Sequence, residues 1–374
     1  MSYEELPIAI HENIIACYAA LDKIPGKKSS FINTGLVDKS YLAATRRLIK
    51  RIAKNGNIPD NGITLGRALT IYPNATSIIF RHDIDVNSEF STADTRDFER
   101  VEALIMRGIK SIVIEMSYLE SFTSLRCLDI VGSNISSIDI IGSLVGLQEL
   151  VLNNVRVTDF TLLSSLTNLK CLNIGYNRQV DIQVLSSLTN LEVLDVSGNK
   201  IRDISVLNGL KKLTQLRAWN NFISDVSPLS GLTQLTSLEI DTNIINDVQP
   251  LASLELLQTL ELGYNIIENI RPLHRLTNLR NLHVYANKFR SLAPLKKLVG
   301  LETLVCGGND IAHVSPVSNL VNLNAINISC THVRDVLCLK NLTKLTMLNI
   351  ENTKITDFEF LFDGAPDLEV WRYT

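Results

Sequence analysis

The sequence predicts an α/β solenoid in which a curved ladder of short parallel strands forms a concave face, with a convex face of 3₁₀ or irregular segments and a small helical N-terminal cap. Three observations lead to this fold class. A leucine recurs every 22 residues, apolar residues alternate after it as in a β-strand, and an asparagine follows most strand segments. Units of this size cannot bury a core alone, so they have to stack on their neighbours.

The repeats begin at leucines that share one position in the sequence pattern. These are Leu125, Leu147, Leu169, Leu191, Leu213, Leu235, Leu257, Leu279, Leu301, Leu323 and Leu345. All ten intervals between them are 22 residues, so eleven repeats run in unbroken register. Positions one, four and six of each repeat are apolar, and positions four and six lie on one face of a strand. We expect that face to form the core.

Two polar positions also recur, and both predict structural roles. Position nine is asparagine in seven repeats, at Asn177, Asn199, Asn221, Asn243, Asn265, Asn287 and Asn309. An inward amide can satisfy backbone groups where each strand ends. Position thirteen is often aspartate, which favours a turn or cap geometry over metal binding. Prolines at position sixteen indicate a loop that leads to the convex side.

The pattern L-x-x-L-x-L-x-x-N resembles the leucine-rich repeat. The 22-residue length and the trailing "DI-x-x-L" are similar to the subclass shared by a regulatory subunit of protein phosphatase and the bacterial internalins. The resemblance covers 125–366 and implies a solenoid. The resemblance also implies a scaffold that binds other proteins, and a scaffold similar to the phosphatase regulator is one form it allows.

The array is expected to carry atypical ends. Residues 69–124 predict capping repeats, with a strand in 72–80, a helix in 91–108 and a shortened repeat in 108–119. Residues 367–374 predict a last capping strand in which Leu368 and Trp371 face inward.

Residues 1–68 do not repeat and predict a small helical unit. The simpler interpretation is an N-terminal cap over the first repeat. The segment also resembles the F-box of ubiquitin-ligase adaptors, and the matching residues are Leu6, Pro7, Ile10, Ile14, Leu36, Val37, Lys39 and Tyr41. That resemblance implies docking to a linker subunit of the ligase.

Composition excludes several partners. The net charge of −3 provides no basic field for nucleic acid, and no run of about 18 apolar residues predicts a membrane span. The first residues do not fit a secretory signal, and the six cysteines show no disulfide or zinc spacing. We therefore expect a cytoplasmic or nuclear location with free thiols.

Motifs for chemistry are missing from the sequence. It contains no phosphate-binding loop of the G-x-x-x-x-G-K-[ST] type, no G-x-S-x-G and no H-E-x-x-H. The six histidines are scattered, and His283 is the one that faces a plausible binding surface. We expect no catalytic residues, no metal and no cofactor. A cryptic hydrolase would require a cluster of His, Asp or Cys residues.

Variation within the repeats predicts where a partner binds. Strand positions three, five and seven point to the concave face, so changes there alter recognition and leave the core intact. The candidate partner-binding residues are Tyr176, Asp195, Arg217, Trp219, Glu239, Asp241, Glu261, Tyr264, His283 and Tyr285. Aromatic residues beside an acidic stripe favour a protein partner with basic and apolar groups. A substrate adaptor of a ubiquitin ligase is the alternative.

Overall fold

The structure is a computed structural model that describes residues 77–80, 85–110, 112–155, 157, 159–178 and 180–372. The chain divides into two units, Met1–Lys54 and Asn55–Thr374, and all described residues belong to the second. The predicted helical unit and its F-box-like motif lie outside the described residues.

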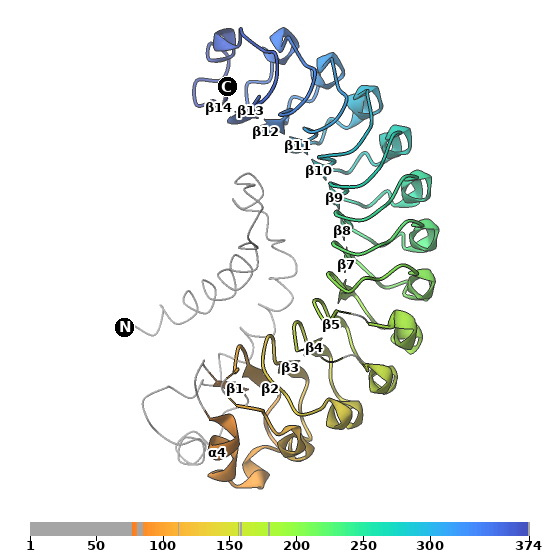
Figure 1. The fold of residues 1–374 in the computed structure, drawn as a ribbon, viewed down its shortest axis with the longest axis vertical. Coiled ribbons are helices and arrows are strands. Elements are labelled where there is room, and N and C mark those ends of the chain that lie inside the picture. Colours follow the sequence, from red (N-terminus) through yellow and green to blue (C-terminus); the bar gives the residue numbers. More distant parts are fainter. Residues whose placement is uncertain are drawn as a thin grey trace. The chain divides into compact units, whose positions relative to one another are not determined.

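The repeats form one sheet of 14 parallel strands, and the strands follow each other in chain order (Figure 1). The strands are β1 (Ser77–Phe80), β2 (Ala103–Met106), β3 (Cys127–Asp129), β4 (Glu149–Val151), β5 (Cys171–Asn173), β6 (Val193–Asp195), β7 (Gln215–Arg217), β8 (Ser237–Glu239), β9 (Thr259–Glu261), β10 (Asn281–His283), β11 (Thr303–Val305), β12 (Ala325–Asn327), β13 (Met347–Asn349) and β14 (Glu369–Trp371). Within the array, the strands line the inner side of the curve and the 3₁₀ turns line the outer side. The predicted solenoid with a parallel sheet on its concave face is confirmed.

Equal repeat length fixes the register of the sheet. Leu194 pairs with Leu216, and Leu216 pairs with Leu238, so each residue lies beside the residue at the same position of the next repeat. The leucines of positions one and four are buried along the whole array and form one continuous core. Burial of each such side chain contributes roughly 1.5–3 kcal/mol, which explains why every repeat supplies its own set.

The convex side is built from short 3₁₀ helices, as the sequence predicts. The repeats contain η3 (Asp139–Ser143), η4 (Thr161–Ser165), η5 (Ile182–Ser187), η6 (Ser205–Gly209), η7 (Ser227–Gly231), η8 (Gln249–Ser253), η9 (Arg271–Arg275), η10 (Ala293–Lys297), η11 (Ser315–Val317), η12 (Leu337–Leu339) and η13 (Glu359–Leu361). Proline occupies the first turn of η7 to η11, where its missing N–H costs nothing.

Both recurrent polar positions have the predicted structural role. The Asn243 amide nitrogen donates to the carbonyls of Ala218 (3.0 Å) and Ile240 (3.1 Å), and its oxygen accepts from the Ile223 N–H (2.9 Å). At position thirteen, Asp225 accepts from the Ser227 N–H at 2.8 Å, directly before η7. Both side chains form hydrogen bonds with backbone groups that the strands leave unpaired.

An aromatic cluster lies in the core of the first described strands. Phe98 stacks on Phe122 with ring centroids 4.6 Å apart, and Phe90 contacts both rings. Phe90 belongs to α4 (Val86–Ser91), which precedes η1 (Thr95–Asp97), and η2 (Met116–Ser121) follows β2. These large buried rings add apolar area to the continuous core.

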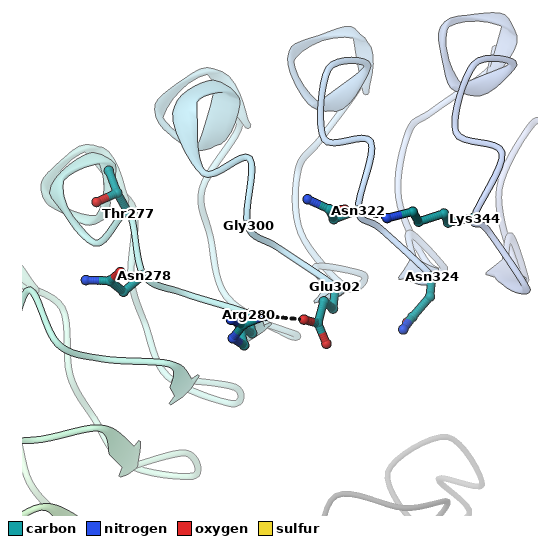
Figure 2. A pocket seen from close by; sticks show the side chains of 8 residues that line it. All are labelled: Thr277, Asn278, Arg280, Gly300, Glu302, Asn322, Asn324 and Lys344. Atoms are coloured by element: carbon teal, nitrogen blue, oxygen red, sulfur yellow. Dashed lines mark hydrogen bonds and ion pairs between the residues drawn. The ribbon is translucent and has the colours of Figure 1, made fainter.

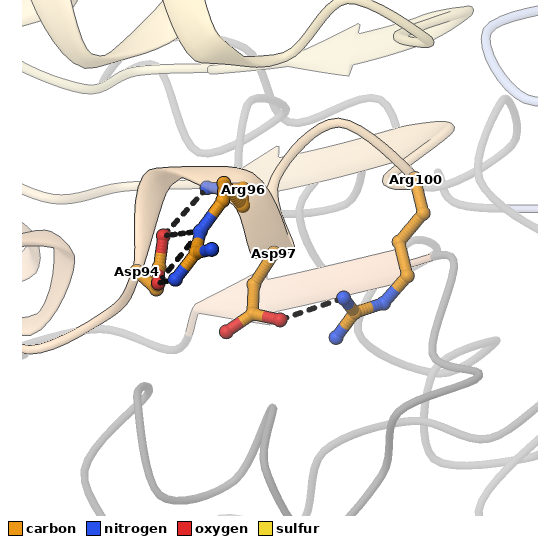
Figure 3. A network of polar contacts seen from close by, with 4 residues as sticks. All are labelled: Asp94, Arg96, Asp97 and Arg100. Carbon is orange, nitrogen blue, oxygen red and sulfur yellow. Dashed lines mark hydrogen bonds and ion pairs between the residues drawn. The ribbon is translucent and has the colours of Figure 1, made fainter.

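Two ion pairs hold the turn around η1 (Figure 3). Asp94 accepts from the Arg96 backbone N–H at 3.0 Å and from its guanidinium, and Arg100 Nη1 lies 2.7 Å from Asp97. The hydrogen bonds from Arg96 lower the pKa of Asp94 to about 2. Asp94 is therefore ionised as the N-cap of η1.

Three predicted details at the ends are wrong. The helix predicted in 91–108 is replaced in its second half by β2, and α4 begins earlier, at Val86. The segment 108–119 contributes only one isolated bridge, from Ile114 to Ile135, and the start of η2. In β14, Val370 pairs with Leu348 and packs on the core, so Trp371 does not face inward as predicted.

Candidate partner-binding surface

The sheet brings position five of successive repeats into one row. Its register pairs Asp195 with Arg217, Arg217 with Glu239, and Glu239 with Glu261; His283 follows beside Glu261. Neighbouring strands lie about 4.8 Å apart, so residues widely separated in sequence become direct neighbours. We call these five residues the position-five row. It contains three carboxylates, one guanidinium and one imidazole.

Arg217 and Glu239 form the central ion pair of the row. Arg217 Nε lies 2.9 Å from Glu239 Oε1 and 3.0 Å from Oε2. Both side chains are largely covered, with exposed fractions of 11% and 16%. A charge-assisted contact with this burial fixes both side chains in one orientation.

His283 sits beside Glu261 as a neutral base. Its Nδ1 lies 3.4 Å from Glu261 Oε1, and its Nε2 is buried without a hydrogen-bond partner. Burial lowers the pKa of His283 to about 4 even with the carboxylate close by. At neutral pH the row therefore carries more negative than positive side chains.

Asp195 departs from the expected exposed stripe. Its exposed fraction is only 4%, because the carboxylate turns toward its own strand and accepts from the Ser197 N–H (3.0 Å) and from Asn173 Nδ2 (3.1 Å). Burial raises the pKa of Asp195, against the opposing effects of Arg217 and these hydrogen bonds. Asp195 therefore belongs to the scaffold side of the row.

Two aromatic pairs flank the row, and glycines make room for their rings. Tyr176 meets Trp219 edge-on at 5.4 Å across the intervening repeat, where a Cβ on Gly198 would lie 2.9 Å from the Tyr176 ring. The ring centroids of Tyr264 and Tyr285 lie 5.5 Å apart. Tyr285 Oη reaches Cys330 Sγ at 3.9 Å.

Position eight of the repeats has a left-handed backbone. Tyr176 and Tyr264 adopt φ angles of 57° and 53° there, as do Asn220, Thr242 and Ala286 at 52–54°. A bulky residue in this region is strained by roughly 1 kcal/mol relative to glycine. The two tyrosines are therefore placed on the rim at a cost in folding stability. Asp241, another predicted partner-binding residue, is at position seven, is partly exposed and accepts from the Thr242 hydroxyl at 3.2 Å.

The sequence analysis missed a half-buried acid near the start of the concave face. Glu149, at position three of the second repeat, lies between Cys127 and Cys171 in the sheet register. Burial and the charge of Asp129 raise the pKa of Glu149 to about 7. The sequence carries a signal for this site. Cysteine occupies the same position in the repeats on either side, so the glutamate lies between small apolar neighbours.

A polar hollow of about 490 Å³ lies on the side where β10 to β13 begin (Figure 2). Arg280 Nη1 pairs with Glu302 at 2.5 Å across it, and Lys344 Nζ donates to Asn322 at 2.7 Å. Arg280, Glu302 and Lys344 therefore each have a polar partner within the hollow. It lies apart from the position-five row, on the loops that precede the strands.

Within the described residues, no group of three or more His, Cys, Asp or Glu side chains could hold a metal ion. The cysteines described, Cys127, Cys171, Cys306, Cys330 and Cys338, are free thiols, and burial raises the pKa of Cys306 to about 12. None of the described helices has both the length and the apolar character needed to cross a membrane.

Comparison with known proteins agrees with this architecture. The family of leucine-rich repeats, in a two-copy form, matches residues 167–209 and 211–253. An internalin (inlF) from Listeria monocytogenes is 26% identical over 77% of this chain and 93% of its own, with a TM-score of 0.69. This chain is an internalin-like leucine-rich-repeat protein.

Two further structures share the fold of this internalin-like protein. A leucine-rich-repeat protein from Leptospira interrogans is 17% identical, with 86% of this chain and 98% of that chain covered and a TM-score of 0.64. The ectodomain of the Arabidopsis thaliana receptor kinase GASSHO1/SCHENGEN3, solved with CASPARIAN STRIP INTEGRITY FACTOR 2, is 18% identical over 79% of this chain and 38% of its own, with a TM-score of 0.62. No curated protein matches the sequence. Leucine-rich-repeat proteins of this kind typically serve as interaction scaffolds without enzymatic activity.

Proposed function

We propose that this internalin-like protein is a non-enzymatic scaffold that binds another protein on the concave face of repeats four to eight. The carrying observation is the group of Arg217, Glu239, Glu261 and His283 beside the pairs Tyr176–Trp219 and Tyr264–Tyr285. Aromatic rings next to desolvated charged groups are typical of the energetic centre of a protein interface. A partner segment with basic and apolar side chains complements this surface.

The structural neighbours support the same use of the fold. The plant receptor ectodomain was solved in complex with another factor, and its repeats superpose on most of this chain. The stacked repeats offer a surface that is pre-organised, so little conformational entropy is lost on binding. The cytoplasmic or nuclear location remains a prediction.

Affinity capture with the full chain tests this proposal. The double variant Trp219→Ala, Glu239→Lys should lose the partner that wild type captures. A matched control, Leu256→Ala with Glu255→Lys, makes the same kinds of change at exposed residues between η8 and β9. It should retain the partner. Equal capture by the wild type and the concave variant would show that the wrong face was chosen.

The ligase-adaptor alternative rests on Leu6, Pro7 and the other F-box-like residues, outside the described part of the chain. The same capture tests it. Recovery of a ligase linker subunit that disappears on Leu6→Asp with Pro7→Ala, but persists in the concave variant, would support the adaptor. If no such subunit is recovered, residues 1–68 remain a predicted cap only.

A further inference from the structure

Three large apolar side chains are exposed at one repeat position in three consecutive repeats. Phe222, Ile244 and Ile266 all occupy position ten, and their exposed fractions are 42%, 43% and 40%. In the described residues, no other repeat position exposes large apolar side chains in three successive repeats. We call these three residues the position-ten stripe.

The backbone forces these side chains outward and side by side. Their N–H groups donate to position eleven of the preceding repeat: Phe222 to Ile201 O at 2.8 Å, and Ile244 and Ile266 to their equivalents at 3.0 Å. Positions nine and eleven, on either side, are buried. Position ten therefore projects from the flank where each strand ends, at intervals of about 5 Å per repeat.

Other repeats place polar groups at this position. In the described part of the array these are Asn134, Arg178, Lys200, Lys288, Asp310, His332 and Lys354, and all are exposed. The stripe therefore exposes apolar side chains to water at a position where the other described repeats expose polar ones. Adjacent exposed apolar side chains at one site mark an interaction surface more often than scattered ones do.

Positive charges bound the stripe at both ends. Lys200 occupies position ten directly before Phe222, and Lys288 occupies it directly after Ile266. Arg202 adds a guanidinium 5.1 Å from the centre of the Phe222 ring. Positions ten and twelve of repeats four to eight carry one acidic side chain, Glu268. They carry four basic side chains, which are Lys200, Arg202, Lys288 and Arg290.

We propose that the position-ten stripe docks an amphipathic helix of a partner protein, with acidic residues at both ends of its apolar face. Apolar residues at i, i+4 and i+7 of a helix lie about 5–6 Å apart, which matches the spacing of the repeats. One face of a strand repeats at roughly 6.6 Å and would fall out of register. Carboxylates one turn before and after the apolar residues would meet Lys200 and Lys288.

This surface is separate from the concave face and extends the proposed function to a second contact. A designed peptide of about 20 residues is the probe: helical, labelled with fluorescein, with leucines at i, i+4 and i+7 and glutamates one turn to either side. Fluorescence anisotropy measures its binding to the full chain. Ile244→Lys should weaken binding at least about tenfold, because it places a charge in the middle of the apolar contact. Leu256→Lys, at an exposed apolar residue outside the stripe, should change it less than about twofold.

Charge reversal tests the ends of the stripe. Lys200→Glu with Lys288→Glu should abolish binding of the glutamate peptide and create binding of a matched peptide with lysines in those places. These residues are exposed, so the variants should unfold at the wild-type temperature. The concave variant Trp219→Ala, Glu239→Lys should bind the glutamate peptide normally, which separates this proposal from the previous one.

Three results would overturn the proposal. The first is no binding of the glutamate peptide to wild type, or binding that Ile244→Lys leaves unchanged. The second is self-association of the wild type in analytical ultracentrifugation that Ile244→Lys abolishes, which would assign the stripe to a second copy. The third is binding to anionic vesicles of phosphatidylserine and phosphatidylcholine that depends on Ile244, which would assign it to a lipid surface.

Discussion

The two ends of the concave face differ from its middle at position five of the repeat. Toward the ends this position holds Val151 and Val305 and five short polar residues, and each polar side chain accepts the N–H two residues further on: Asp129, Asn173, Asp195, Asn327 and Asn349. In the middle it holds Arg217, Glu239, Glu261 and His283, which contact each other across strands.

Side-chain length explains the difference. Aspartate and asparagine are short enough to bond to their own backbone, as in an Asx turn, so they satisfy the strand end and are buried. Longer side chains extend past the strand and meet their neighbours. The residue type at this one repeat position therefore separates strands whose side chains bond to their own backbone from strands whose side chains can contact a partner.

The largest test of this comparison uses pH. His283 has a folded pKa of about 4 against an ordinary value of 6.5, so the unfolded chain binds more protons between these values. Because of this histidine, the free energy of unfolding of the protein should fall by about 3 kcal/mol as the pH falls from 6.5 to 4. His283→Asn should remove that part of the pH dependence in urea unfolding. An unchanged slope would contradict the burial of a neutral imidazole.

Glu149, near the N-terminal end of the face, provides the opposite control. Its pKa of about 7 exceeds the ordinary value of 4.5, so the folded protein binds the extra proton and stability falls as pH rises through this window. Glu149→Gln should stabilise the protein above pH 7 and flatten the slope with a sign opposite to that of His283→Asn.

The next largest effect concerns the self-satisfied end. Asp195→Ala removes the acceptor of the Ser197 N–H and of Asn173 Nδ2, both buried, and should cost about 2 kcal/mol. Asp195→Asn keeps an acceptor for the Ser197 N–H and should cost less. Thermal and urea unfolding measure both. A loss for Asp195→Ala no greater than that for Glu261→Ala would erase the distinction between end and middle.

The smallest effect is the coupling within the middle. A double-mutant cycle of Arg217→Leu and Glu239→Leu should give a coupling free energy of about 1 kcal/mol, because the pair is largely covered but not fully desolvated. Each single variant should lose more than half of the stability that the double variant loses. The reason is that it leaves one charged side chain partly buried without the opposite charge of the pair. A coupling near zero would mean that the two side chains meet without fixing each other.

Much of this molecule follows from its repeat length. The strand ladder, the buried leucines and the asparagine column were all predicted, because an identical position in each 22-residue unit must meet itself in the next. The ends were predicted less well. β2 lies outside the 22-residue spacing, since Ala103 pairs with Cys127, and β14 keeps the spacing but has Asp367 in place of the leucine of position one.

The fold, and the direction of the side chains in the strands of the eleven repeats, follow from the sequence alone, since alternation along a strand is a local property. Which of the outward side chains are exposed depends on contacts that form when the repeats stack. Asp195 turns back to its own backbone, and Tyr176 crosses Gly198 to reach Trp219. The tertiary structure also brought Phe222, Ile244 and Ile266 into one stripe, because exposure depends on neighbours that stacking supplies.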